Sequence, residues 1–158
     1  GEMLMARQEV GLVWLQFVAS KADGIRELQA QFPDAKIETE DKKSFAEYEI
    51  ALHNYWQGHD LCPKVPIDLI GSDFQKLVWA ALMQLPAGAT CSYTQLALQL
   101  GKPTAARAVA SACATNNVAL LVPCHRVVRS DGNLAGYRWG LDRKQWLLEH
   151  ERGKQSLF

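Results

Sequence analysis

The residues best suited to chemistry form one heptad, Val122-Pro123-Cys124-His125-Arg126-Val127-Val128. A thiol becomes a strong nucleophile only when it loses its proton, and a neighbouring base or cation favours that loss. The apolar residues 119–122 predict a buried strand, which would hold Cys124 on rigid backbone. We therefore interpret Cys124 as a nucleophile. The alternative is a buried structural cysteine, because free cysteines are among the most buried residues.

Activation of Cys124 needs a base, and His125 is the nearest candidate in the sequence. Successive side chains of a strand point to opposite faces, so a direct thiol–imidazole pair would need a sharp bend, and otherwise a bridging water. A carboxylate usually orients such an imidazole. Glu151 is the candidate, since an acidic side chain near the end of the predicted last helix opposes the helix dipole. The alternative is a solvated surface glutamate.

The distribution of charge points to a polyanionic partner. The 158 residues include 17 basic and 17 acidic side chains, but residues 1–71 hold 7 basic and 12 acidic ones. Residues 72–158 hold 10 basic and 5 acidic ones, so the half with Cys124 has a net charge of +5. The electrostatic field of a positively charged half attracts phosphates. A chance division of solvated charges is the alternative.

Apolar periodicity predicts a mostly helical second half. The helices are expected at residues 73–82, 94–100, 104–115 and 141–152. The turn Gly101-Lys102-Pro103 between the second and third is typical of a helix-turn-helix. The alanine-rich third helix carries Arg107 and could approach either another helix or a DNA groove. Spacing alone does not separate these readings, and the positive charge favours nucleic acid.

The first 70 residues predict a small α/β unit without catalytic groups. A strand-like stretch at residues 7–19 could form a hairpin with the N-terminal segment. Helices are expected at residues 23–32, with Asp23 as N-cap, and at 44–56, with Ser44 and Glu47 as a capping box. The predicted fold is therefore an α/β N-terminal subdomain, residues 1–70, followed by a mainly α-helical, winged-helix-like subdomain with a helix-turn-helix, residues 71–158.

Composition argues against several classes of protein. No apolar stretch approaches the ~20 residues that span a bilayer, and the first residues lack the features of a secretory signal, so we expect no membrane partner. The four cysteines lie far apart without a Cys-x-x-Cys pair, which favours a reducing compartment and hence the cytosol. His53, His59 and Cys62 are too few and too loosely spaced to predict a zinc site.

An ordered series of short motifs surrounds Cys124. The series comprises Ser92-Tyr93-x-Gln95-Leu96-Ala97, Gly101-Lys102-Pro103, Ala106-Arg107-Ala108-Val109, Pro123-Cys124-His125-Arg126-Val127, Gly136-Tyr137 and Trp146-Leu147-Leu148-x-x-Glu151. In this order, over about residues 72–152, it strongly resembles the O6-alkylguanine-DNA alkyltransferases (methylated-DNA–protein-cysteine methyltransferases). Trp139 and residues 109–114 are most similar to the C-terminal domain of bacterial adaptive-response regulators. The chain is either a stand-alone enzyme or an excised domain.

The resemblance implies direct reversal of DNA damage without a cofactor. Cys124 would take an alkyl group from O6 of guanine, and in some cases from O4 of thymine, irreversibly and once per molecule. Glu151, His125 and a water would draw off the thiol proton. Asn116 would hold the turn between the recognition helix and the active-site segment. Tyr93 would donate a hydrogen bond to the departing guanine.

The resemblance also implies a monomer that binds the minor groove of double-stranded DNA, with the alkylated guanine flipped out. Arg107 would fill the vacated place. The implied DNA-contacting residues are Tyr93, Lys102, Arg107, Ala108, Ser111, Ala112 and Ser130. Contacts mainly to phosphates would make binding strongly salt-dependent. The protein is expected in the bacterial cytosol, without a metal.

The expected alkyl pocket is formed by Tyr137, Arg138 and Trp139. Trp139 stands where mammalian members have a small residue, which predicts poor reaction with bulky benzyl adducts.

Three other functions are alternatives to alkyl transfer. A lesion-binding relative normally lacks the acceptor cysteine, a DNA-binding regulator would keep a structural cysteine, and a cysteine hydrolase needs a directly paired histidine.

Overall fold

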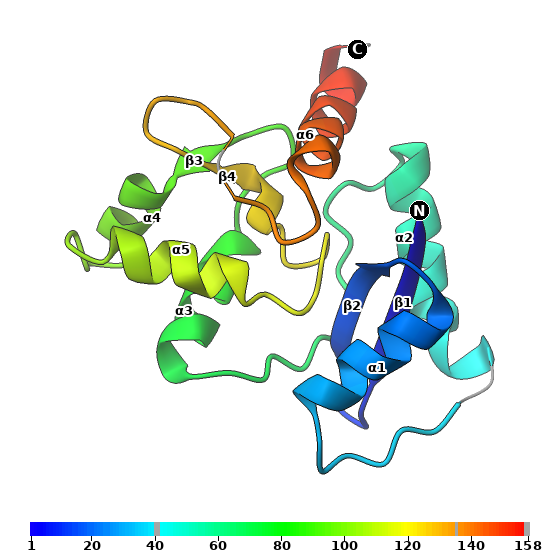
Figure 1. Ribbon diagram of the computed structural model, residues 1–158. Coiled ribbons are helices and arrows are strands. Elements are labelled where there is room, and N and C mark those ends of the chain that lie inside the picture. Colours follow the sequence, from blue (N-terminus) through cyan, green and yellow to red (C-terminus); the bar gives the residue numbers. More distant parts are fainter. Residues whose placement is uncertain (40–41, 135, 157–158) are drawn as a thin grey trace. The chain divides into compact units, whose positions relative to one another are not determined.

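The computed structural model describes residues 1–39, 42–134 and 136–156 (Figure 1). The chain forms two compact units, Gly1–Asp68 and Leu69–Phe158. The first combines a two-stranded sheet with helices and the second is mainly helical, so the predicted fold class is confirmed. Among the described residues, no helix combines the length and the apolar character that crossing a bilayer requires.

The first unit is built on the expected hairpin. Strands β1 (Glu2–Arg7) and β2 (Leu12–Val18) pair antiparallel. Helix α1 (Lys21–Gln31) packs across the hairpin (Figure 1), and α2 (Ala46–Gln57) follows a short 3-10 helix, η1 (Lys42–Phe45). The core of this unit is apolar and comes mainly from β2 and α1; it contains Val13, Trp14, Val18 and Leu28.

Two helix starts in this unit differ from the prediction. Asp23 is not the N-cap of α1, because Ser20 is extended and its hydroxyl accepts a hydrogen bond from Asp23 N at 3.1 Å. The predicted capping box at Ser44 is also wrong, since η1 includes this residue and α2 begins at Ala46 without a side-chain cap. Several residues near each start have the side chain of a cap, and the local backbone conformation selects among them.

Two capping boxes fix the helix starts in the second unit. Ser72 and Gln75 cap α3 (Asp73–Leu82), and Ser92 and Gln95 cap α4 (Tyr93–Gln99). Each reciprocal pair satisfies N–H groups that the first turn of a helix leaves without an intrahelical partner. Helix α4 starts one residue earlier than predicted, which puts Tyr93 in its first turn.

The helix-turn-helix consists of α4 and α5 (Ala106–Ala114), which pack against each other (Figure 1). Gly101 in the turn has φ +71°, a region that glycine adopts without steric cost. The buried side of α5 packs on α3, where Trp79 Nε1 donates to Ala112 O at 2.9 Å. The last helix, α6 (Leu141–Ser156), is four residues longer than predicted.

The predicted strand at residues 119–122 is wrong. This segment turns, with Leu120 at φ +69° and a hydrogen bond from Val122 N to Val118 O at 3.1 Å. Cys124 instead begins a 3-10 helix, η2 (Cys124–Arg126). Strand β4 (Val127–Val128) follows and pairs in parallel with β3 (Cys91–Ser92). The segment is buried as expected, and burial demands apolar residues whether the backbone is extended or turned.

Candidate active site

Cys124 is held by a buried asparagine. The cysteine has 5% of its surface exposed, and Asn116 Nδ2 donates to its Sγ at 3.3 Å. The same Nδ2 donates to Val122 O at 2.9 Å, while Asn116 Oδ1 accepts from Val118 N at 2.9 Å. A single amide therefore closes the turn before η2 and fixes the sulfur at its end.

The residue after the thiol pairs with a carboxylate. His125 Nε2 lies 2.7 Å from Glu151 Oε1, and both side chains are fully buried. The interpretation of Glu151 as a surface residue is thereby wrong. Glu151 lies on α6, 26 residues after His125 in the sequence, and the two side chains meet because α6 packs on η2.

Arg126 anchors this carboxylate, a role that the sequence analysis missed. Its Nε donates to Glu151 Oε2 at 3.0 Å and its Nη2 to Oε1 at 2.8 Å, which makes a bidentate pair. Its Nη1 donates to Leu85 O at 2.7 Å. Gly88 N adds a long contact of 3.4 Å to Glu151 Oε2. Adjacency to His125 was the only signal in the sequence, and it did not reveal the partner.

The pKa shifts of the pair give each member a definite charge. Burial by itself raises the pKa of Glu151, but hydrogen bonds from His125 and Arg126 outweigh it and hold the pKa at about 2. Burial lowers the pKa of His125, against the opposing effect of Glu151. A carboxylate cannot donate, so Nε2 carries the proton and the neutral imidazole keeps a lone pair on Nδ1. That buried Nδ1 has no hydrogen-bond partner among the described residues, which leaves it able to accept a proton.

The thiol itself is protonated in the resting protein. Burial raises the pKa of Cys124, and the hydrogen bond from Asn116 opposes this shift, as do the charges of Lys144 and Arg138. The arrangement stabilises a thiolate once it forms without keeping it charged beforehand. Nucleophilic attack by this sulfur therefore needs removal of its proton, and the nearby imidazole is the available base.

Lys144 is a second functional candidate that the sequence analysis missed. Its side chain is fully buried on α6, and its Nζ donates to Gly136 O at 3.2 Å. Burial lowers its pKa, whereas the thiols of Cys124 and Cys113 raise it. Helical spacing of three, four and seven residues from Leu147, Leu148 and Glu151 gave a signal for its burial, because these side chains share the buried face of α6.

The predicted pocket residues lie in the segment that joins β4 to α6. The rings of Tyr137 and Trp139 meet edge to face at 5.2 Å, and Trp139 is buried. The Arg138 guanidinium lies over the Trp139 ring at 5.6 Å from its centroid. Arg138 Nη1 donates to Asn116 O and to Asn117 Oδ1, each at 3.0 Å. The structure thus connects this segment to the turn that holds the thiol.

The predicted DNA-contacting residues divide into two groups. Arg107, Ala108 and Ser111 are exposed on α5, and Lys102 and Ser130 are exposed on turns. Ala112 differs from the expectation, because it is 2% exposed and faces α3, where small size permits close helix packing. Its assignment to a DNA-contacting surface is therefore wrong.

Tyr93 is the first residue of α4 and is half-buried, and Ser130 lies beside the next residue of that helix. Burial raises the pKa of Tyr93 to about 12, with contributions from Cys113 and Cys124, so its hydroxyl remains a hydrogen-bond donor. Ser130 Oγ lies 3.4 Å from Thr94 Oγ1. In the described parts of the chain, no group of three His, Cys, Asp or Glu residues is arranged to hold a metal ion.

Known proteins resemble this chain over most of its length. It is 44% identical over 151 residues to the bifunctional transcriptional activator/DNA repair enzyme Ada of Escherichia coli strain K12, covering 96% of this chain and 42% of that protein. It is 40% identical to the methylated-DNA–protein-cysteine methyltransferase of Methanosarcina barkeri, covering 96% of this chain and 90% of the relative. The chain spans less than half the length of the Ada proteins that it matches.

The likeness extends to solved structures and to a family model. Mycobacterium tuberculosis OGT, solved in complex with DNA, has a TM-score of 0.82 and 36% identity, covering 96% of this chain and 87% of that one. The model of the 6-O-methylguanine DNA methyltransferase DNA-binding domain matches residues 73–153, which include both Cys124 and Glu151. On this match and on the identity to the M. barkeri relative, the chain belongs to the 6-O-methylguanine DNA methyltransferase family.

Proposed function

We propose that this chain repairs DNA by transferring an alkyl group from O6 of guanine to Cys124 Sγ, once per molecule. The observation that carries the proposal is the buried thiol of Cys124, which accepts a hydrogen bond from Asn116 and is next in sequence to the His125–Glu151 pair. All of these residues lie within the segment that the family model matches. The names of the relatives, methylated-DNA–protein-cysteine methyltransferase among them, support the same reaction.

In this reaction one bond forms and one breaks at the alkyl carbon. The Cys124 sulfur attacks the carbon in line, the bond from that carbon to O6 breaks, and guanine leaves with the electron pair. A water between Sγ and His125 Nδ1 passes the thiol proton to the imidazole, whose positive charge Glu151 stabilises. The thioether is stable and no group regenerates the thiol, so the protein acts once.

The departing guanine carries negative charge that a hydrogen-bond donor would stabilise. Tyr93 suits this role, because its raised pKa keeps the hydroxyl protonated at neutral pH. Asn116 suits the role of a positioning residue, since its amide contacts both the sulfur and the turn. Arg138, Tyr137 and Trp139 would line the alkyl pocket.

We further propose that α5 enters the minor groove of duplex DNA and that the alkylated guanine is flipped out of the stack. The exposed face with Arg107, Ala108 and Ser111 supports this docking, because its small side chains allow close approach and Arg107 can fill the vacated place. Lys102 and Ser130 would contact phosphates. The OGT relative was solved in complex with DNA, which supports a DNA partner.

The remaining parts of the proposal concern the state of the protein. We assign residues 71–158 to the DNA-binding and alkyl-acceptor domain and residues 1–70 to an accessory α/β domain. We expect a monomer without cofactor or metal. The four cysteines are free thiols, and a nucleophilic thiol works only in its reduced state, which supports a reducing bacterial cytosol.

The proposal is tested by intact-mass measurement after mixing the protein with a duplex that contains one O6-methylguanine. We expect a gain of one methyl group, mapped to Cys124 and limited to one per molecule. Cys124→Ala should gain none, and Cys62→Ala, which removes the exposed thiol, should react like the unaltered protein. Tight lesion binding without any mass gain would make the protein a damage-recognition module instead.

A further inference from the structure

We infer that Arg138 is a specificity-determining latch of the alkyl pocket: it ties residues 136–140 to the turn that holds Cys124 and so limits the size of the alkyl group that reaches the thiol. The inference rests on the proposed alkyl transfer and adds to it the residue that sets its size range. It concerns a side chain outside the cysteine, histidine and glutamate that perform the proton transfer.

The latch is a pair of hydrogen bonds that connects two distant segments. Arg138 Nη1 donates to Asn116 O and to Asn117 Oδ1, both at 3.0 Å, across 22 and 21 residues of sequence. Asn116 in turn donates through its side chain to Cys124 Sγ at 3.3 Å. The backbone carbonyl of Asn116 therefore accepts a hydrogen bond from Arg138, while the side-chain amide of Asn116 holds the Cys124 sulfur. Movement of Arg138 is thereby coupled to the thiol.

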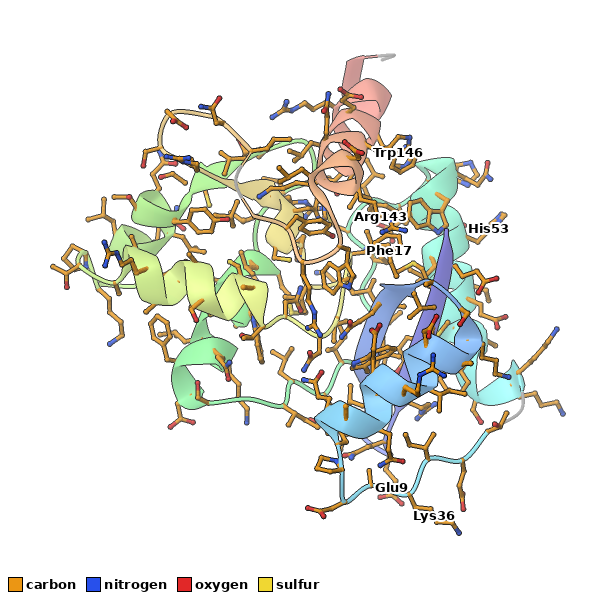
Figure 2. The ribbon with its side chains drawn as sticks, viewed as in Figure 1. Glu9, Phe17, Lys36, His53, Arg143 and Trp146 are labelled. Carbon is orange, nitrogen blue, oxygen red and sulfur yellow. The ribbon has the colours of Figure 1, made fainter. Side chains whose placement is uncertain are left out.

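The segment that Arg138 holds begins and ends at a glycine with positive φ. Gly136 and Gly140 stand at its two ends with φ of +57° and +102°, where residues with a side chain would be strained. The hydrogen bonds from Lys144 to Gly136 O and from Arg143 to Trp139 O, at 3.2 and 2.9 Å, come from α6. Figure 2 labels Arg143 on this helix.

The two sets of anchors have different consequences. The bonds from Lys144 and Arg143 connect the backbone of the loop to the helix into which it runs, so they hold the loop to α6. The bonds from Arg138 instead connect the loop directly to the Asn116 turn. The Arg138 guanidinium also lies over the Trp139 ring at 5.6 Å, and the Tyr137 ring meets the same indole edge to face at 5.2 Å. The hydrogen bonds that fix Arg138 therefore also fix the positions of the Tyr137 and Trp139 rings.

Loss of the latch should affect adducts according to size. A methyl group is the smallest alkyl group and needs the least displacement of the loop. Butyl and benzyl groups need the loop and its two aromatic rings to withdraw, and that withdrawal breaks the Arg138 hydrogen bonds. A latch therefore slows transfer of large groups selectively, whereas a merely structural residue would slow all adducts alike.

The test measures single-turnover transfer, by intact mass, from three duplexes that carry O6-methyl-, O6-butyl- or O6-benzylguanine at one site. Arg138→Met removes the donors while keeping a long side chain. We expect the ratio of butyl to methyl transfer rates to rise on the order of tenfold, as for loss of a charge-assisted hydrogen-bond pair. Asn117→Ala keeps the guanidinium and removes one acceptor, so it should shift the ratio in the same direction by less.

Arg152→Met is the matched control, because it removes one exposed arginine charge from α6. It should leave the ratio unchanged. An unchanged ratio in Arg138→Met, or equal slowing of all three adducts, overturns the latch, and if that variant does not fold, the Asn117→Ala ratio decides in the same way. Absence of transfer by the unaltered protein would instead refute the proposed function, so the two failures are distinguishable.

Discussion

Replacement of Glu151 by glutamine tests the buried charge network directly. The carboxylate is fully buried, accepts two hydrogen bonds from Arg126 and pairs with His125 at 2.7 Å. Glutamine keeps the shape and removes the charge. The Arg126 side chain, 3% exposed, is then left in the interior without its counter-charge.

The expected loss of stability is about 3–5 kcal/mol, the usual cost of removing one partner of a buried ion pair. A second route gives a similar figure. A pKa of about 2 against the ordinary 4.5 corresponds to about 3 kcal/mol of stability at neutral pH. We expect alkyl transfer to slow on the order of a hundredfold as well, because the imidazole loses the charge that orients and stabilises it.

The double variant Arg126→Met/Glu151→Gln separates the two effects. Without the guanidinium no uncompensated charge remains, so most of the lost stability should return. The transfer rate should stay low, because the carboxylate is still absent. Urea unfolding measures the first quantity and single-turnover transfer from an O6-methylguanine duplex measures the second.

Two results would refute this reasoning. If Glu151→Gln transfers methyl groups within about threefold of the unaltered rate, instead of on the order of a hundredfold more slowly, the carboxylate has no part in proton removal. If the double variant is as unstable as the single one, the cost does not come from the stranded guanidinium, and the packing of α6 on η2 must account for it.

Further predictions concern acidity, salt and pocket size. Because the pKa of Glu151 is depressed, its contribution to stability is complete above pH 4.5 and is lost as the pH falls toward 2, so acid unfolding of Glu151→Gln should show a weaker pH dependence. Because burial raises the pKa of Cys124, its labelling by iodoacetamide should be slower than that of exposed Cys62 and should accelerate only above pH 9, as peptide mass mapping would record. Lys102→Ala should lower the slope of log Kd against log salt by about one in a titration of DNA binding. Trp139→Gly should speed inactivation by free O6-benzylguanine at least about tenfold, and an unchanged rate would remove Trp139 from the pocket.

Much of the scaffold could be predicted because its signals are local. The hairpin and the helix before the thiol follow from apolar patterning, and the Ser72 start of α3 follows from cap chemistry within four residues. The errors have a local cause too. Ser20 was overlooked in favour of Asp23, and residues 119–122 were assigned to a strand because buried turns and buried strands are equally apolar.

The sequence by itself determined the family motifs and singled out Cys124 and His125 as the proposed nucleophile and base, because residue types and short spacings carry that information. Only the tertiary structure decided the partners that act across long separations. Arg126 and Glu151 are 25 residues apart, Arg138 and Asn116 are 22 apart, and Lys144 is buried near the thiols of Cys124 and Cys113. Such pairs form because α6 and the preceding loop fold back onto η2 and the Asn116 turn. Once buried there, each charge must find a counter-charge or a hydrogen bond, and no local pattern in the chain encodes which one it finds.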